Sequence, residues 1–298
     1  MTEILKEISN GLAGIVEAIG PSIVRVEARR RMPASGIVWS SDGTVITADH
    51  TIEREENIQV GLDDGRTAPA ALIGRDATTD VAVIRVQTEG LRPPPWAGAL
   101  DVRVGHLVVA LARPGRSVRA RLGVMSAVGD QWRTPAGAQI DRYLEADVDF
   151  GPGFSGGPLV NIAGQAVGLN TAGLSRRRYV TVPADTLTRV VDTLLTHGRI
   201  RRGYLGIAAQ PVRLPEAKAS ELGQRRGLML ISVEQGSPAE RAGLHQGDIL
   251  VALDDAPAPH VSDIVALLGA DRIGSAVRLK VIRAGAIQTV TATVGERG

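Results

Sequence analysis

The chain has 298 residues, enough for two domains, and its 34 Lys and Arg nearly balance 32 Asp and Glu, which gives a net charge of +2 at pH 7. So small a charge does not favour nucleic acid as a partner. A pI of about 9.3 and the arginine runs at residues 29–31 and 176–178 leave a preference for acidic partners open, with solvated loops as the alternative for both runs. The absence of cysteine excludes disulfides, thiolate metal sites and a cysteine nucleophile.

Residues 1–20 predict an amphipathic N-terminal helix, because apolar side chains recur at helical spacing. They are Ile4, Leu5, Ile8, Leu12, Ile15 and Val16. Acidic residues near the start and the lack of a continuous apolar segment argue against a signal peptide. No run approaches the roughly 18 apolar residues that indicate a transmembrane helix.

Short apolar segments bounded by Gly, Pro and Asp recur from residue 22 to residue 183 and predict about a dozen strands. They lie at residues 22–28, 36–40, 44–48, 58–62, 70–74, 81–86, 106–112, 122–128, 143–148, 159–164, 165–170 and 179–183. So many short strands fit two packed six-stranded β-barrels with a site in the cleft between them.

A helical stretch follows Pro183 and is expected to end at Gly198 as its C-cap. The basic segment 199–202 then reads as a linker, and the composition changes after it. We therefore expect one domain over residues 21–198 behind the N-terminal helix and a second domain over residues 203–298.

The segment GPGFSGGPL, residues 151–159, carries the strongest signal for chemistry. Glycines around Ser155 allow tight backbone turns and close approach to a substrate, which makes this serine a candidate nucleophile. A serine hydroxyl needs a base, and the base needs an orienting acid. His50 follows an apolar strand and Asp80 directly precedes one, so both side chains are expected at strand ends. Each residue alone fits a turn or structural role as well.

Together and in this order, these residues resemble the trypsin-like serine proteases. The segments VITADHTI, TTDVAVIRV and GFSGGPLVN resemble the HtrA/Deg branch most closely. The resemblance covers nearly the whole chain and implies a mainly β fold of two six-stranded trypsin-like barrels. It also implies that His50 is the general base, that Asp80 orients it, and that Ser155 attacks the scissile carbonyl.

The resemblance assigns the oxyanion hole to the backbone N–H groups of Gly153 and Ser155. Phe154 stands where the family usually has Asn. Because the donors belong to the main chain, this departure puts the mobility and contacts of the loop in doubt more than the chemistry.

Residues 168–185, GLNTAGLSRRRYVTVPAD, are expected to bind substrate through Thr171, Ala172, Gly173 and Tyr179. Thr171 matches a serine that supports the triad aspartate in trypsin-like enzymes, and an ordinary strand threonine is the alternative. Tyr179 aligns with a glycine that borders the primary specificity pocket. A ring there predicts a narrow apolar pocket, unless Tyr179 points to solvent.

From residue 203 the chain resembles a bacterial PDZ domain, an α+β fold. Its carboxylate-binding loop would be Tyr204, Leu205, Gly206 and Ile207, whose N–H groups would capture a peptide C-terminus. Ser237 is expected to cap a short helix in a capping box with Glu240. Ile264 and Leu268 would line the groove, or lie in the core.

No metal or cofactor is expected. The four remaining histidines show neither ligand spacing nor nearby cysteines, and no phosphate-binding glycine motif is present. The histidines outside the proposed triad are His106, His197, His245 and His260.

The chain is therefore predicted to be an ATP-independent serine endopeptidase of the HtrA/Deg type that cleaves unfolded or damaged proteins. A catalytically idle peptide-binding or chaperone module is the alternative. The family implies trimers formed through N-terminal aromatic residues, but none precedes Trp39, so the N-terminal helix is the alternative contact. The chain as written is expected in the cytoplasm, or in the periplasm or another extracytoplasmic space if a leader has been removed.

Overall fold

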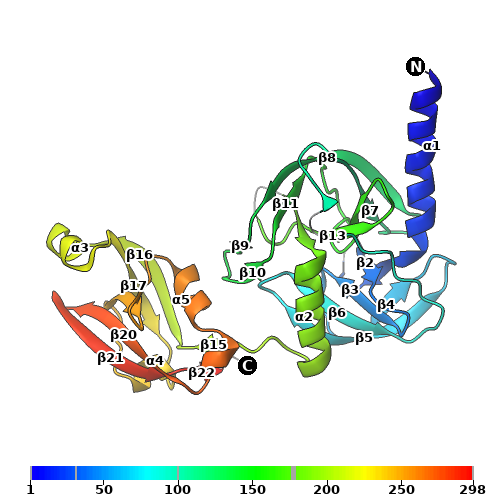
Figure 1. The fold of residues 1–298 in the computed structure, drawn as a ribbon. Helices are drawn as coiled ribbons and strands as arrows, with labels where there is room; N and C mark the ends of the chain where they lie inside the picture. Colours follow the sequence, from blue (N-terminus) through cyan, green and yellow to red (C-terminus); the bar gives the residue numbers. More distant parts are fainter. Residues whose placement is uncertain (1, 31, 99–100, 176–178, 297–298) are drawn as a thin grey trace. The chain divides into compact units, whose positions relative to one another are not determined.

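The computed structural model describes residues 2–30, 32–98, 101–175 and 179–296. It contains two compact units (Figure 1). The first consists of residues 1–134 and 139–200, and the second of residues 135–138 and 201–298. Each unit has its own hydrophobic cores. The expected domain limits stay predictions.

The first unit begins with a closed six-stranded barrel whose strand order is β1-β2-β3-β6-β5-β4. The strands are β1 (Ile23–Glu27), β2 (Ala34–Val38), β3 (Thr44–Thr47), β4 (Ile58–Gly61), β5 (Thr67–Asp76) and β6 (Val81–Val86). Branched side chains such as Val24, Val45 and Ile84 fill its interior. These residues favour strands because their stiff side chains pack well on a pleated surface.

A second six-stranded sheet has the order β11-β8-β7-β12-β13-β14. Its strands are β7 (Leu107–Ala112), β8 (Arg119–Gly129), β11 (Tyr143–Ala146), β12 (Pro158–Asn161), β13 (Ala166–Thr171) and β14 (Val180–Pro183). Its end strands β11 and β14 lie against each other, so this barrel is nearly closed. The prediction of two six-stranded barrels is confirmed. The small ribbon of β9 (Trp132–Arg133) and β10 (Gln139–Ile140) was not expected.

Helix α1 (Thr2–Ile19) confirms the amphipathic N-terminal helix. Its second half packs on the barrels: Leu12, Ile15 and Val16 contact a core cluster that includes Leu111 and Val160. Its first half leaves its apolar side chains exposed, and these are Ile4, Leu5 and Ile8. None of the described helices has the length and apolar content needed to cross a membrane.

Helix α2 (Ala184–His197) covers the first unit with one apolar face, which includes Leu187, Val191 and Leu194. It ends at Gly198, whose φ of 69° is left-handed and whose N–H donates to the Leu194 carbonyl over 2.8 Å. Glycine adopts this conformation at little cost, so the predicted C-cap is confirmed.

The second unit contains a six-stranded sheet, ordered β16-β17-β18-β20-β21 with β19 paired to β18, and short helices pack on it. Its strands are β15 (Gly203–Tyr204), β16 (Ile207–Arg213), β17 (Arg226–Val233), β18 (Ile249–Leu253), β19 (Ala256–Pro257), β20 (Ala276–Arg283), β21 (Ala286–Thr293) and β22 (Gly295–Glu296). Its helices are α3 (Glu216–Leu222), α4 (Pro238–Arg241) and α5 (Val261–Leu267). This mixture confirms the predicted α+β class.

Candidate active site

His50 and Asp80 form a hydrogen-bonded pair on the first barrel. His50 lies in the short 3-10 helix η2 (Asp49–Thr51), which follows β3, and Asp80 directly precedes β6. His50 Nδ1 lies 2.8 Å from Asp80 Oδ2, and the His50 N–H donates to Asp80 Oδ1 over 2.8 Å. A carboxylate only accepts hydrogen bonds, so Nδ1 carries the proton and Nε2 is left as the basic nitrogen.

Asp80 is fixed by its backbone as well as by its side chain. Its φ of 56° lies in the left-handed region, which Asp tolerates better than most residues. Its carbonyl accepts the Asp49 N–H over 3.2 Å. Only 3% of Asp80 is exposed, whereas the His50 side chain is 36% exposed. The pair therefore places a buried acid behind a ring that solvent and substrate can reach.

Thr171, the last residue of β13, holds Asp80 from the second barrel. Its hydroxyl donates to Asp80 Oδ2 and accepts the Gly173 N–H over 2.8 Å. Gly173 lies so close to the pair that a Cβ there would stand 2.5 Å from Asp80 Oδ2 and 2.7 Å from His50 Nδ1. Thr171 thus makes the contact with Asp80 that a supporting role for its hydroxyl requires.

A salt-bridge cluster next to His50 in the chain was not predicted from the sequence. Arg75 Nε donates to the buried carboxylate of Asp49, and Arg75 Nη1 contacts Glu55 Oε1 at 3.0 Å. The hydrogen bond to Asp49 raises the pKa of the Arg75 guanidinium above its ordinary value. These contacts anchor η2, the helix that presents His50.

Ser155 lies in a loop whose glycines are required by backbone crowding. Gly156 has a φ of 87°, and a Cβ there would stand 2.0 Å from the Ser35 carbonyl oxygen. A Cβ on Gly157 would stand 2.1 Å from the Leu111 carbonyl oxygen. Only glycine fits either place, because the nearest atoms belong to backbone and cannot move aside.

The N–H groups of Gly153 and Ser155 are the predicted oxyanion donors. Neither makes a hydrogen bond to any described residue, so both are available to a ligand. Gly153 has a φ of 89°. Ser155 and His50 are both described, and no hydrogen bond joins them. Catalytic hydrogen bonds are often long without substrate and tighten when it binds.

Ser35 on β2 holds this loop and was also missed from sequence. Its hydroxyl donates to the Gly153 carbonyl over 2.7 Å and accepts the Arg113 N–H over 2.8 Å. Its own N–H donates to the Ser155 carbonyl over 3.2 Å. Ser35 thereby holds the peptide units on both sides of the one that carries the Ser155 N–H.

Phe154 replaces the family's usual Asn with a hydrophobic anchor. Its ring is buried in the core of the second barrel with residues such as Val108 and Leu159. The Arg121 guanidinium lies 5.3 Å from the ring centroid, a cation–π contact. The side chain thus fixes the loop between Gly153 and Ser155 by burial.

Tyr179, Ala172 and Gly173 lie at the predicted substrate-binding segment and are exposed. The Tyr179 ring packs on buried Phe150, with centroids 5.2 Å apart and planes inclined by 44°. Tyr179 is 36% exposed. Its ring therefore has one face on protein and does not point wholly to solvent. The arginine run 176–178 lies outside the described residues, as does Arg31 of the other run.

In the second unit, the segment Tyr204–Ile207 leads into β16. The N–H groups of Leu205 and Gly206 bond no described residue, and the φ of Gly206 is 78°. The Leu205 side chain is buried in the core, so only its backbone can meet a peptide. The Tyr204 hydroxyl donates to Glu234 Oε2.

Ile264 on α5 and Leu268 at its C-cap are buried in the core of the second unit. This is the alternative that the sequence analysis left open for them. The predicted capping box is only half formed: Ser237 Oγ accepts the Glu240 N–H over 3.1 Å, but the Glu240 carboxylate accepts from Gly236 N–H instead of Ser237.

Comparisons with known proteins agree with this architecture. Residues 34–169 match the family described as trypsin-like peptidase domain, and residues 203–294 match the PDZ domain family. The molecule is thus a trypsin-like peptidase fold followed by a PDZ domain.

Relatives narrow this class. The probable periplasmic serine endoprotease DegP-like of Halomonas elongata is 32% identical over 302 residues, which cover 99% of this chain and 63% of the relative. The Chlamydia trachomatis protein of the same name is 33% identical over 91% of this chain and 55% of its own. The chain belongs to the HtrA/DegP-like family of trypsin-like serine proteases with a PDZ domain. It spans less than two thirds of the length of these curated relatives.

Solved structures give the same result. The HtrA-type protease AlgW with decapeptide is 25% identical, with a TM-score of 0.73 over 96% of this chain and 98% of the other. The serine endoprotease from Yersinia pestis is 27% identical, also with a TM-score of 0.73 over 96% and 98%. Both chains extend over nearly all of the present fold.

Proposed function

We propose that the protein is an ATP-independent serine endopeptidase whose triad is His50, Asp80 and Ser155. The observation that carries the proposal is the two-point contact between His50 and Asp80, in which both carboxylate oxygens accept a hydrogen bond from His50 at 2.8 Å. Such a contact fixes both the tautomer and the ring plane. An acid that only stabilised the fold would not need to hold the imidazole so completely.

In the proposed reaction, His50 Nε2 takes the proton of the Ser155 hydroxyl as Oγ attacks the scissile carbonyl. The imidazolium that forms is stabilised by Asp80, which keeps its negative charge. The Gly153 and Ser155 N–H groups donate to the oxyanion of the tetrahedral intermediate. His50 then gives its proton to the leaving amine, and water hydrolyses the acyl-enzyme by the same steps.

We further propose unfolded or damaged proteins as substrates, because a strand-lined cleft binds extended backbone. The PDZ domain would capture peptide C-termini or segments at the loop Tyr204–Ile207. Two observations support this: the free N–H groups of Leu205 and Gly206, and the decapeptide named with the similar protease AlgW.

We also propose a cellular compartment and an oligomeric state for the protein. The relatives are named periplasmic, which favours the extracytoplasmic alternative over the cytoplasm. The exposed apolar half of α1, with Ile4, Leu5 and Ile8, is the surface we propose for self-association, with a homotrimer as the expected oligomer. Light scattering coupled to size exclusion measures the number of protomers.

The test is the Ser155→Ala variant assayed with casein and with a fluorophosphonate probe. We expect a loss of turnover on the order of a millionfold and no labelling, because the nucleophile is removed. Ser126→Ala, which alters an exposed serine of β8, is the matched control and should keep full activity. Residual activity above about a hundredth in the purified Ser155→Ala variant would require another nucleophile. A wild-type chain that neither cleaves nor labels would favour the idle peptide-binding module.

A further inference from the structure

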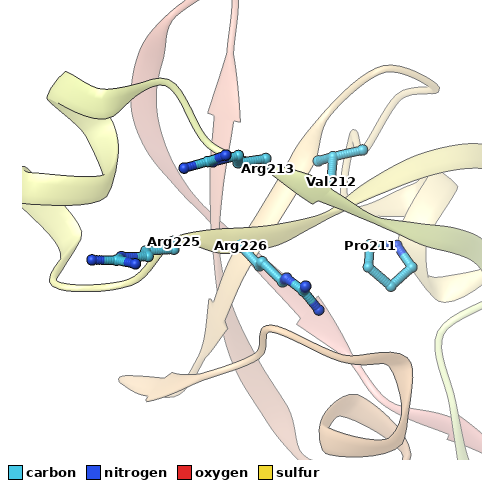
Figure 2. Close-up of a pocket in the computed structure, with 5 residues that line it drawn as sticks. All are labelled: Pro211, Val212, Arg213, Arg225 and Arg226. Carbon is cyan, nitrogen blue, oxygen red and sulfur yellow. The ribbon is translucent and has the colours of Figure 1, made fainter.

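A hollow of about 510 Å³ lies at the end of the β16–β17 hairpin (Figure 2). Its lining is Pro211, Val212, Arg213, Arg225 and Arg226, and we call it the arginine cleft. All three arginines are exposed. No described acidic residue forms an ion pair with any of them, although Glu216 lines a neighbouring hollow beside Arg213 and Arg225.

The clustering of these arginines is electrostatically unfavourable when no ligand is bound. Arg213 and Arg226 are direct cross-strand partners in the antiparallel β16–β17 ladder. Like charges directly opposite each other destabilise a strand pair. A bound anion would offset this repulsion. The positive charge of the cluster therefore favours binding of an acidic partner.

The cleft also continues the peptide groove that the proposed function assigns to the PDZ domain, and the inference rests on that function. β16 is an edge strand with one free side. Ile207 and Ala209 pack in the core beneath α5, together with Ile264. Alternation along the strand places Pro211 and Arg213 on this same face, and Figure 2 shows Pro211 and Arg226 on one side of the strand pair with Val212 on the other.

The position of the carboxylate-binding loop sets the direction in which a bound peptide runs along β16. A C-terminus held at Tyr204–Ile207 makes the peptide run antiparallel to β16, so its upstream residues approach Arg213. Arg213 follows Ile207 by six residues, so the peptide residue at its level stands about six before the C-terminus.

Pro211 interrupts the backbone donors that β16 offers to a peptide. Proline has no N–H, and edge strands take it where the nitrogen faces the free side. At the level of Pro211, β16 therefore offers a peptide no donor, so side chains there carry a larger share of the recognition. The side chains available there are the arginines.

We propose that the arginine cleft selects peptides that carry acidic side chains about five to seven residues before their C-terminus, with Arg213 and Arg226 as the specificity-determining residues. Apolar residues at the C-terminal end anchor the peptide, and the upstream acids decide among peptides with similar ends.

The experiment uses the full chain with Ser155→Ala, so that peptides are bound without being cut. Decapeptide pools with a free C-terminal carboxylate and four randomised apolar end positions carry either three Glu or three Gln upstream. The most enriched end sequence is made as a matched Glu and Gln pair, and fluorescence anisotropy gives both Kd values. We expect the Glu peptide to bind about fivefold more tightly, since exposed ion pairs each contribute modestly, and the ratio to shrink in about 0.5 M NaCl.

Variants assign the effect to the cleft. Arg213→Gln with Arg226→Gln should abolish the preference, whereas Arg278→Gln, an exposed arginine on β20, should keep it. Arg213→Glu with Arg226→Glu should reverse it toward a Lys peptide, a gain that a misfolded domain cannot produce. Equal affinities for Glu and Gln peptides, or a preference that survives the double Gln variant, would overturn the inference alone. Capture of no peptide from either pool would overturn the proposed capture role and the inference with it.

Discussion

His50 and Asp80 lie on the first barrel and are joined through side chains, whereas Ser155 lies in a loop of the second barrel that is held through its backbone. We call the first group, with Thr171 and Gly173, the base half of the proposed site, and residues 151–157 with Ser35 its nucleophile half. The base half is tied by hydrogen bonds to a buried carboxylate. The nucleophile half depends on glycines, one serine hydroxyl and a buried ring.

The difference reflects what each half must do. A base has to keep one tautomer and one orientation, which side-chain hydrogen bonds define well. An oxyanion hole has to aim main-chain N–H groups, so the protein must control peptide planes instead. Changes in the first half should therefore affect proton transfer, and changes in the second should affect stabilisation of the intermediate.

After the loss expected for Ser155→Ala, the largest effect is expected from Asp80→Asn. The amide would favour the wrong histidine tautomer and leave Nε2 protonated, so kcat should fall by about 10⁴-fold while the fold remains. Casein cleavage and fluorophosphonate labelling rates measure this. A loss of less than tenfold would contradict the assignment of Asp80 as the orienting acid.

Ser35→Ala should have the next largest effect. Removing one oxyanion donor costs about 10²–10³-fold in kcat, and Ser35 acts on the donors through the loop, so a loss of about tenfold to a hundredfold is expected with little change in KM. Binding of a peptide aldehyde, which forms the tetrahedral adduct, should weaken in parallel. Ser126→Ala is again the control. If KM rises and adduct binding is unchanged, Ser35 has only a structural role.

The third prediction concerns the specificity pocket, which we expect beside the nucleophile half. Tyr179 packed on Phe150 predicts a narrow apolar pocket that accepts Ala or Val and excludes Phe, Lys and Arg. Each methylene discriminates by only about 1 to 3 kcal/mol, so preference should be graded among small residues. Mass spectrometry of a digested, denatured protein gives the cleavage sites, and Tyr179→Gly should admit larger residues. A majority of wild-type cuts after aromatic or basic residues would refute the prediction.

The smallest effect on the chemistry is expected from deletion after Arg202. Both halves of the site lie in the first unit, so the truncated chain should label with fluorophosphonate at nearly the full rate. Cleavage of long substrates should fall, because a tethered capture site raises the local substrate concentration. Equal casein cleavage by the two forms would remove the proposed role of the PDZ domain.

Sequence reasoning succeeded where the determinant is local. Alternating apolar residues defined the strands of both barrels, and Gly198 marked the end of α2. His50, Asp80 and Ser155 could be proposed as a triad because each lies in a short motif, and that assignment stays a prediction. Thr171 could be named only from the resemblance, and its contact with Asp80 joins residues on different barrels.

Ser35 and the Arg75–Asp49 pair show what sequence alone could not give. Ser35 looks like any serine in a strand, and its partners Gly153 and Ser155 lie more than a hundred residues away. Arg75 looks like a surface residue until β5 is placed beside η2. Glu240 was near enough for a capping box, but its side chain reached Gly236. Such contacts depend on registers and turns that no local pattern specifies.

The contact of Gly173 with the His50–Asp80 pair gives a way to recognise relatives that have lost activity. Any other residue at this position would place a carbon where the carboxylate and the imidazole meet, at 2.5 Å and 2.7 Å. A homologue could then retain histidine, aspartate and serine in their motifs and still be unable to bring them into register. Inspection of this single position would separate homologues with a disrupted triad from those with an intact one. A search for the three triad residues alone would not distinguish them.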